Sequence, residues 1–209
     1  MPNDALDQEV FCPVLWRDLE KLDPETVARL SGAERTATGF NLKFFGRNHR
    51  LDSANQLLVG PPDLRAVGFV KTMVVLSYLV KSAQGPAPGL ANELVGPWTL
   101  PGGSVFFRGP HALPMESLVE VFGQDPEGFL AKALALGADA ITDTAFRFRV
   151  LPFVELGCYL DPADEEFPAR ISWSFDRYAH YYLALDGLWG LALALVSEMV
   201  DGPSPLVFS

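Results

Sequence analysis

Apolar residues recur every three or four positions between Val14 and Leu22, which is the period of one face of a helix. The pattern restarts at Asp23-Pro24, where Asp suits an N-cap and Pro suits the first helical position. Ser31-Gly32 then supplies a stop signal, because Gly readily follows the last residue of a helix. The sequence therefore predicts two short helices before residue 33.

The pattern changes to short β-type runs between residues 34 and 58, separated by turn residues such as those at Gly39 and Gly46. This predicts an antiparallel meander. Residues 66–82 are then apolar over a length that suits a helix buried on more than one face. This helix is expected to be central to the core.

Helical patterns follow over 114–122 and 125–136, and alternation returns from Phe146 to Val150, which predicts a strand. Further strands are expected over 154–160 and 170–175, and a last helix over 185–200. Strands grouped apart from helices indicate an α+β fold, with antiparallel sheet regions and several packed helices. We expect a single compact domain over residues 1–209, with poorly ordered tails at 1–9 and 202–209.

Charge and composition narrow the classes of partner. The chain has 209 residues and a net charge of -10, so its field should repel a phosphate backbone, and we expect no nucleic-acid partner. The most apolar stretches, 66–80 and 183–200, are too short or too charged to span a membrane. The acidic N-terminus lacks the apolar region of a secretory signal, so we expect a cytoplasmic protein.

The two cysteines, Cys12 and Cys158, are far apart in sequence, and neither belongs to a CxxC pair. This leaves no zinc or iron–sulfur ligand pattern, and we expect both to be reduced core thiols. The sequence also lacks GxSxG and P-loop patterns, so it indicates neither a serine nucleophile of that type nor a nucleotide phosphate cradle.

A segment rich in Gly and Pro, residues 85–114, is the longest predicted connection, and such connections in compact domains are usually functional. It contains Trp98, Gly102-Gly103 and Phe106. One interpretation is a loop whose aromatic side chains pack beneath it. The other is a cover over a bound ligand, with the glycines allowing close approach of the backbone.

Carboxylates gather between the last two predicted strands, where Glu165 and Glu166 lie in a turn and Asp176 ends the following strand. Such a group could bind a hard cation. Alternatively, its carboxyl groups could have different pKa values, so that one acts as an acid and another as a base. The turn lacks the Gly and the spacing of a calcium loop, and a solvated acidic turn is the alternative.

His180 lies among aromatic residues, with Asp176 and Arg177 close by in sequence. It is a candidate general base or axial ligand of a haem-like metal, and the alternative is a hydrogen-bonded structural histidine. His49 and His111 share no metal-ligand spacing with it, so we predict no metal site from these residues alone.

A series of short motifs carries a resemblance to a known family. In chain order they are Leu22-Asp23-Pro24-Glu25, Ser31-Gly32-Ala33, Phe44-Phe45-Gly46, Leu100-Pro101-Gly102-Gly103, Asp164-Glu165-Glu166-Phe167-Pro168 and Phe175-Asp176. The chain resembles the uncharacterised bacterial domain of unknown function 3786, found mostly in anaerobes. Some relatives carry an added cysteine-rich iron–sulfur segment, which implies a redox or metallocofactor setting, and this chain has no such segment.

Three functional hypotheses follow. The first is a module in anaerobic metabolism that binds a small molecule or metallocofactor of unknown identity. The second is an enzyme that uses the acidic turn with metal-assisted or acid/base chemistry. The third is a protein-interaction domain or homodimer. We expect the Gly- and Pro-rich loop, the acidic turn and His180 to converge on one concave surface. The residues predicted for this ligand site are Trp98, Gly102, Gly103, Phe106, Glu165, Glu166, Asp176 and His180.

Overall fold

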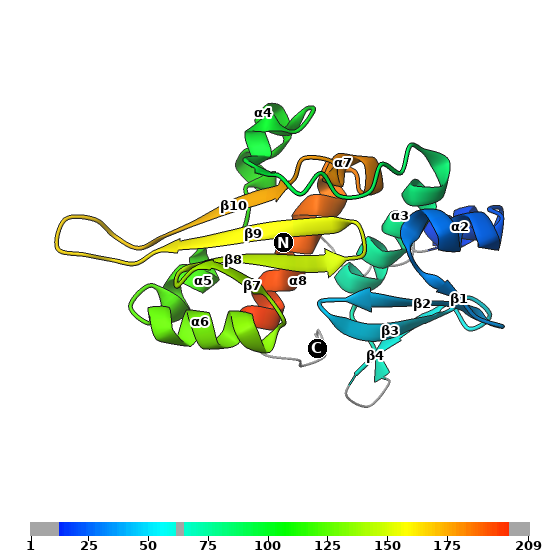
Figure 1. The fold of residues 1–209 in the computed structure, drawn as a ribbon, viewed down its shortest axis with the longest axis horizontal. Coiled ribbons are helices and arrows are strands. Elements are labelled where there is room, and N and C mark those ends of the chain that lie inside the picture. The colour runs from blue at the N-terminus through cyan, green and yellow to red at the C-terminus, as the bar shows by residue number, and fades with distance from the viewer. Residues whose placement is uncertain (1–12, 62–64, 201–209) are drawn as a thin grey trace.

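Two five-stranded antiparallel sheets, with helices packed beside them, form the part of the chain that the structure describes, residues 13–61 and 65–200 of a computed structural model (Figure 1). This arrangement confirms the predicted α+β class. In residues 13–61 and 65–200 no helix is long and apolar enough to cross a membrane. The tails predicted to be poorly ordered, and Cys12, lie outside the described residues.

The N-terminal sheet is a meander in which neighbouring strands follow chain order. This is the topology predicted for residues 34–58, extended by one further strand. Its strands are β1 (Glu34–Arg35), β2 (Gly39–Phe44), β3 (Arg47–Asp52), β4 (Leu57–Gly60) and β5 (Arg65–Ala66).

The C-terminal sheet has the strand order β6-β10-β9-β8-β7, and its three long central strands were all predicted. The short edge strands β6 and β7 were not. All four residues of β7 are exposed, so the strand has no apolar alternation to reveal it. The strands are β6 (Leu94–Val95), β7 (Asp139–Thr142), β8 (Ala145–Leu151), β9 (Val154–Asp161) and β10 (Arg170–Asp176).

The helix predicted to follow Asp23 begins directly after this cap residue. The Asp23 carboxylate accepts hydrogen bonds from the amide and the hydroxyl of Thr26, at 2.9 and 2.7 Å, and Gly32 has a φ of 68° just after the helix. A helix also occupies residues 13–20. The others are α2 (Pro24–Ser31), α3 (Phe69–Gln84), α4 (Gly103–Phe106), α5 (Glu116–Phe122), α6 (Pro126–Ala135), α7 (Ala179–Tyr182) and α8 (Leu185–Val200), with 3-10 turns η1 (Pro97–Thr99) and η2 (Gly109–His111).

One hydrophobic core joins both sheets through α3 and α8, the two longest of these helices. They approach closely where a Cβ on Gly190 would lie 3.3 Å from Val74. Buried Tyr78 of α3 donates a hydrogen bond to the Ser31 carbonyl (2.6 Å) and accepts one from the Phe153 amide (3.3 Å). The core therefore depends on residues from both ends of the chain.

An ion-pair cluster joins the N-terminal sheet to the two long helices, α3 and α8. The Glu198 carboxylate of α8 pairs with Arg47 of β3 and with Lys71 of α3, and Lys71 and Glu198 are almost fully buried. The Phe45 amide, between β2 and β3, donates a hydrogen bond to the Val150 carbonyl of β8 (3.0 Å), which links the two sheets. Removing one member would leave a buried charge without its counterion, which is strongly destabilising.

Candidate functional site

The Gly- and Pro-rich segment is fixed to the end of β10 by side chains that accept hydrogen bonds from its backbone. Asp176 Oδ1 accepts from the amide of Ala91 (3.1 Å) and from that of Tyr178 (2.9 Å). The Tyr182 hydroxyl accepts from the Gly89 amide at 2.6 Å. Asp176, predicted to bind a ligand, is thus fully buried as a support for the loop, although its Oδ2 has no hydrogen-bond partner among the described residues.

Two of the aromatic side chains of this segment pack inward. Phe107 stacks on Phe175 with ring centroids 5.8 Å apart, and Phe106 stacks on His111 at 4.5 Å. Trp98 differs, since 59% of its surface is exposed. The segment therefore covers part of its own apolar cluster, as the first of the two interpretations expected for its aromatic residues.

The two predicted glycines are required by the backbone. Gly102 has a φ of 79°, in the left-handed region that favours glycine. A Cβ on Gly103 would lie only 2.0 Å from the Pro97 carbonyl oxygen. Both positions therefore have a conformational reason to be glycine that involves no ligand.

His180 lies in α7, four residues after Asp176 ends β10, and its Nδ1 is 3.0 Å from the Arg177 carbonyl oxygen. The acidic turn lies at the other end of the same strand, at the tip of the long β9–β10 hairpin (Figure 1). A strand rises about 3.3 Å per residue, so the seven residues of β10 keep Glu165 and Glu166 about 20 Å away. The structure does not bring the acidic turn to Asp176 and His180.

The acidic turn is organised by its own backbone. Asp164 Oδ1 accepts hydrogen bonds from the amides of Phe167 (2.7 Å) and Glu166 (2.8 Å), and these bonds lower the pKa of Asp164. The side chains of Glu165 and Glu166 are exposed. Within residues 13–61 and 65–200, no group of three or more His, Cys, Asp or Glu side chains is placed to hold a metal ion.

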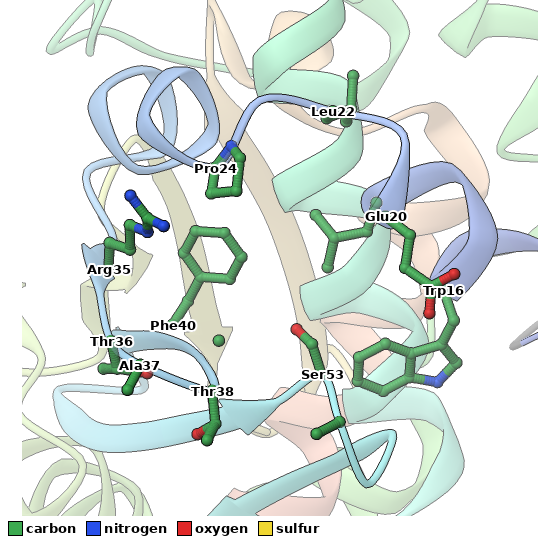
Figure 2. A pocket seen from close by; sticks show the side chains of 13 residues that line it. Trp16, Glu20, Leu22, Pro24, Arg35, Thr36, Ala37, Thr38, Phe40 and Ser53 are labelled. Carbon is green, nitrogen blue, oxygen red and sulfur yellow. The ribbon is translucent and has the colours of Figure 1, made fainter.

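A pocket of about 340 Å³ lies instead beside the N-terminal sheet (Figure 2). Three segments line it: the first helix with the turn that follows it, the β1–β2 connection, and the turn after β3. None of the eight predicted site residues belongs to it. We call it the aromatic pocket; its lining is Trp16, Leu19, Glu20, Leu22, Pro24, Arg35, Thr36, Ala37, Thr38, Gly39, Phe40, Ser53 and Ala54.

The walls of the aromatic pocket are apolar. Trp16 and Phe40 lie on opposite sides of the opening in Figure 2, and both side chains are almost completely buried against the core. The helix that carries Trp16 buries one stripe of its residues, and β2 buries alternate residues, so each element directs a ring to the same core. Pockets with such walls bind the apolar body of a ligand.

The rim of the pocket is polar and held in shape by backbone hydrogen bonds. The Thr36 amide donates to the Gly39 carbonyl (2.9 Å), and the Ser53 amide donates to the Thr38 carbonyl (2.8 Å). Gly39 has no room for a side chain, because a Cβ would lie 2.1 Å from the Leu51 carbonyl oxygen. The β1–β2 connection is thus fixed against β3, and its threonines are positioned at the pocket.

The Thr36 side chain has a feature that the neighbouring hydroxyls lack. Its Oγ1 is buried and has no hydrogen-bond partner among the residues that the structure describes. Buried polar groups are usually hydrogen-bonded, so each exception requires an explanation. Because this oxygen has almost no exposed surface, a polar atom of a bound molecule would become its partner once the Thr36 side chain turns toward the pocket.

The charged side chains at the aromatic pocket are Glu20, which is exposed, and Arg35, whose guanidinium pairs with Glu25 outside the lining. The lining includes no histidine, cysteine or methionine. The arrangement therefore suits binding through apolar contact and hydrogen bonds. It does not present the paired acid and base of general acid–base catalysis.

No clear signal in the sequence indicates this pocket. Thr36, Thr38 and Gly39 have the composition of an ordinary turn, and Trp16 was one apolar residue in a predicted helix. The signal lies in the tertiary structure, where one hydroxyl is buried without a partner beside a hollow.

These features define an α+β domain with two antiparallel sheets and a pocket beside the N-terminal one. The chain matches a family described as Domain of unknown function (DUF3786) over residues 23–198, and it belongs to that family. No curated protein and no solved structure matches it. The matched segment includes the β1–β2 connection and Phe40, whereas Trp16, Leu19 and Glu20 precede it.

Proposed function

We propose that the protein is a binding module for a small, largely apolar molecule, held in the aromatic pocket. The observation that supports this most directly is the buried Thr36 hydroxyl without a partner at a pocket with aromatic walls. Leaving such a group unpaired costs about 1–3 kcal/mol. A ligand oxygen or nitrogen at Thr36 would remove that cost on binding.

The dimensions of the pocket limit the class of ligand. A volume of about 340 Å³ is near the lower end of the range for small-molecule sites, roughly 300–1,000 Å³. The rings of Trp16 and Phe40 favour a flat, unsaturated body. We therefore propose a fragment-sized ring compound with one hydrogen-bonding group directed at Thr36.

A metallocofactor is a poorer fit to this pocket. Haem iron is usually held by His, Cys, Met or Tyr, and iron–sulfur clusters are held by Cys. The lining residues include none of these side chains. The ligand that we propose is accordingly an organic molecule bound without coordination to the protein.

The test compares Thr36→Val with Thr38→Val, a matched change at the exposed hydroxyl of the same connection. Indole, adenine and nicotinamide serve as probes in ligand-observed NMR, followed by titration of whichever binds. Thr36→Val should weaken binding about tenfold, because the lost hydrogen bond corresponds to about 1.4 kcal/mol. Thr38→Val should bind within about twofold of the wild type.

The free energy of unfolding provides a second measurement, in which Thr36→Val should improve on the wild type while it binds ligand more weakly. In the ligand-free protein, Thr36→Val removes a buried polar atom without a partner and should raise the free energy of unfolding by up to about 1 kcal/mol. Weaker binding together with higher stability identifies Thr36 as a ligand contact. Saturable binding that is unchanged in Thr36→Val, or lower stability of that variant, would contradict the proposal.

A further inference from the structure

The charges of the chain are divided unevenly between its two parts. Residues 1–84 contain ten basic and ten acidic side chains, whereas residues 85–209 contain six basic and 16 acidic ones. The net charge of -10 therefore comes entirely from the second part. Basic side chains gather at a pocket of the N-terminal sheet, and acidic side chains gather at the tip of the β9–β10 hairpin.

A second pocket, of about 410 Å³, lies at β2 and β3, and we call it the basic pocket. The antiparallel register pairs Asn41 with Arg50 and Lys43 with Asn48, so these four side chains share one face of the sheet. Lys43 and Arg50 are exposed there and form no ion pair with any described residue. The full lining is Gly32, Glu34, Asn41, Leu42, Lys43, Asn48, His49 and Arg50. Glu34, opposite Asn41 on β1, is its one carboxylate, and Lys43 and Arg50 outnumber it.

The opposite end of the molecule has complementary chemistry. Residues 162–169, which we call the acidic arm, form the tip of the β9–β10 hairpin at one end of the molecule in Figure 1. The base of the arm is attached to the end of α5, since the Ala163 amide donates to the Gly123 carbonyl at 3.1 Å. Glu165 and Glu166 are exposed, and Phe167 beside them is 66% exposed. The Asp164 turn fixes the backbone of the tip, so little conformational entropy would be lost on docking.

We infer that the acidic arm of one copy docks in the basic pocket of a second copy. Glu165 and Glu166 would face Lys43 and Arg50, and the asparagine side chains would donate to carboxylate oxygens. Phe167 would add apolar contact that a purely charged segment lacks. This inference is independent of the aromatic pocket, since the two pockets share no residue.

The positions of the arm and the pocket determine the kind of assembly. In Figure 1 the arm lies at one end of the longest axis and the N-terminal sheet at the other, so the arm does not reach the pocket of its own chain. The contact is therefore head-to-tail, and it yields open chains unless the rotation between copies closes a ring. Eight residues bury little area, so the association should be weak, with a Kd between about 0.1 and 1 mM.

Salt should act on this association in two ways. Two copies that each carry a net charge of -10 repel one another at very low salt, but at about 0.1 M the Debye length is about 10 Å and this long-range repulsion is screened. Ion pairs in contact survive that concentration and weaken at higher salt. Association should be strongest near about 0.1 M and lost near about 0.5 M salt.

The experiment is sedimentation velocity of the full chain up to about 1 mM, at about 0.1 M and about 0.5 M salt, with two charge-reversed variants. E165K/E166K makes the arm basic, and K43E/R50E makes the pocket acidic. Each variant alone should associate at least tenfold more weakly than the wild type. An equimolar mixture should recover association, because each arm then meets a pocket of opposite charge.

A control variant, E120K/E127K, changes the net charge as much as E165K/E166K does, at exposed positions outside the arm. It should associate at least as well as the wild type. The inference is overturned if the wild type is monomeric at about 1 mM and about 0.1 M salt, or if the mixture fails to associate. It is also overturned if inorganic phosphate saturates Lys43 and Arg50 in a protein that stays monomeric, since the pocket would then be a site for a small anion.

Discussion

Two connections in this molecule use their polar groups in opposite ways. Residues 85–114 form the longer connection, and the amides of Gly89 and Ala91 are satisfied by Tyr182 and Asp176. The β1–β2 connection is only a few residues long, yet Thr36 buries a hydroxyl without a partner beside a pocket. The first connection has the properties of a scaffold, and the second is the one at which we propose a binding site.

The comparison shows that length and glycine content are weak indicators of function. A long loop requires many hydrogen bonds to hold one shape, and buried side chains nearby are used to provide them. Asp176 looked like a ligand residue for the same reason that makes it a good support, since it is a carboxylate at the end of a strand. Thr36 Oγ1 and Asp176 Oδ2 both lack a partner among the described residues, and the difference is that Thr36 lines a pocket.

The largest effect that we predict is the loss of the Asp176 support. Asp176→Ala removes the buried acceptor of the amides of Ala91 and Tyr178, two half-buried residues, which should cost about 2–4 kcal/mol of unfolding free energy. Asp176→Asn keeps an acceptor oxygen and should lose less than half as much. Urea denaturation followed by circular dichroism measures both.

Asp164→Ala is the matched control for that prediction. Asp164 Oδ1 also accepts from two amides, but in an exposed turn where water replaces a lost acceptor. Its denaturation midpoint should move much less than that of Asp176→Ala. Equal shifts in the two alanine variants would remove the distinction between a buried support and a surface turn.

Much of the fold was predictable because its signals are local. Asp23-Pro24 and Gly32 mark the ends of α2, and the helix predicted over 185–200 coincides with α8, since caps and periodicity act within one turn. Strand β7 was missed because all its residues are exposed. Local patterns identify an element only when one of its faces is buried.

The site could not be predicted in the same way. The aromatic pocket combines Trp16, Phe40 and Ser53 from three segments, and nothing in the sequence fixes their spacing in space. The unsatisfied state of Thr36 depends on which atoms surround it after folding. The predicted convergence of the acidic turn with His180 ignored the length of β10, which places them at opposite ends of the strand.

A smaller effect should follow the loss of the Tyr182 hydroxyl. Tyr182→Phe leaves the Gly89 amide without its acceptor and should cost about 1 kcal/mol of stability. Hydrogen exchange should show faster exchange at Gly89, while the amides of α8 change only by the global loss. Tyr181→Phe is the control, since the Tyr181 hydroxyl forms no hydrogen bond with the described residues. Unchanged exchange at Gly89 in Tyr182→Phe would show that this bond does not hold the loop.

The smallest effect that we predict concerns His49, which, like Asp176 and Tyr182, is a buried polar side chain in contact with a backbone group. Unlike them, it can gain a positive charge as the pH falls. Its Nδ1 lies 3.0 Å from the Arg47 carbonyl oxygen, and burial lowers its pKa below 6.5. The contact with that carbonyl and the charge of Glu198 oppose the lowering, whereas the charges of Arg47 and Lys71 add to it. Below pH 6.5 the unfolded chain therefore binds a proton more readily than the folded protein does, so protonation favours unfolding.

The contribution of neutral His49 to the free energy of unfolding is accordingly fully present above pH 6.5. It is lost as the pH falls through the lower pKa that His49 has in the folded protein. The urea midpoint of the wild type should fall between about pH 7 and pH 5.5, above the range where carboxylates titrate. His49→Gln should show a flatter profile over that interval. The prediction would be contradicted by an NMR titration that gives the His49 ring a pKa at or above 6.5. Identical pH profiles of the urea midpoint for the wild type and His49→Gln would show that the buried imidazole contributes nothing to acid sensitivity.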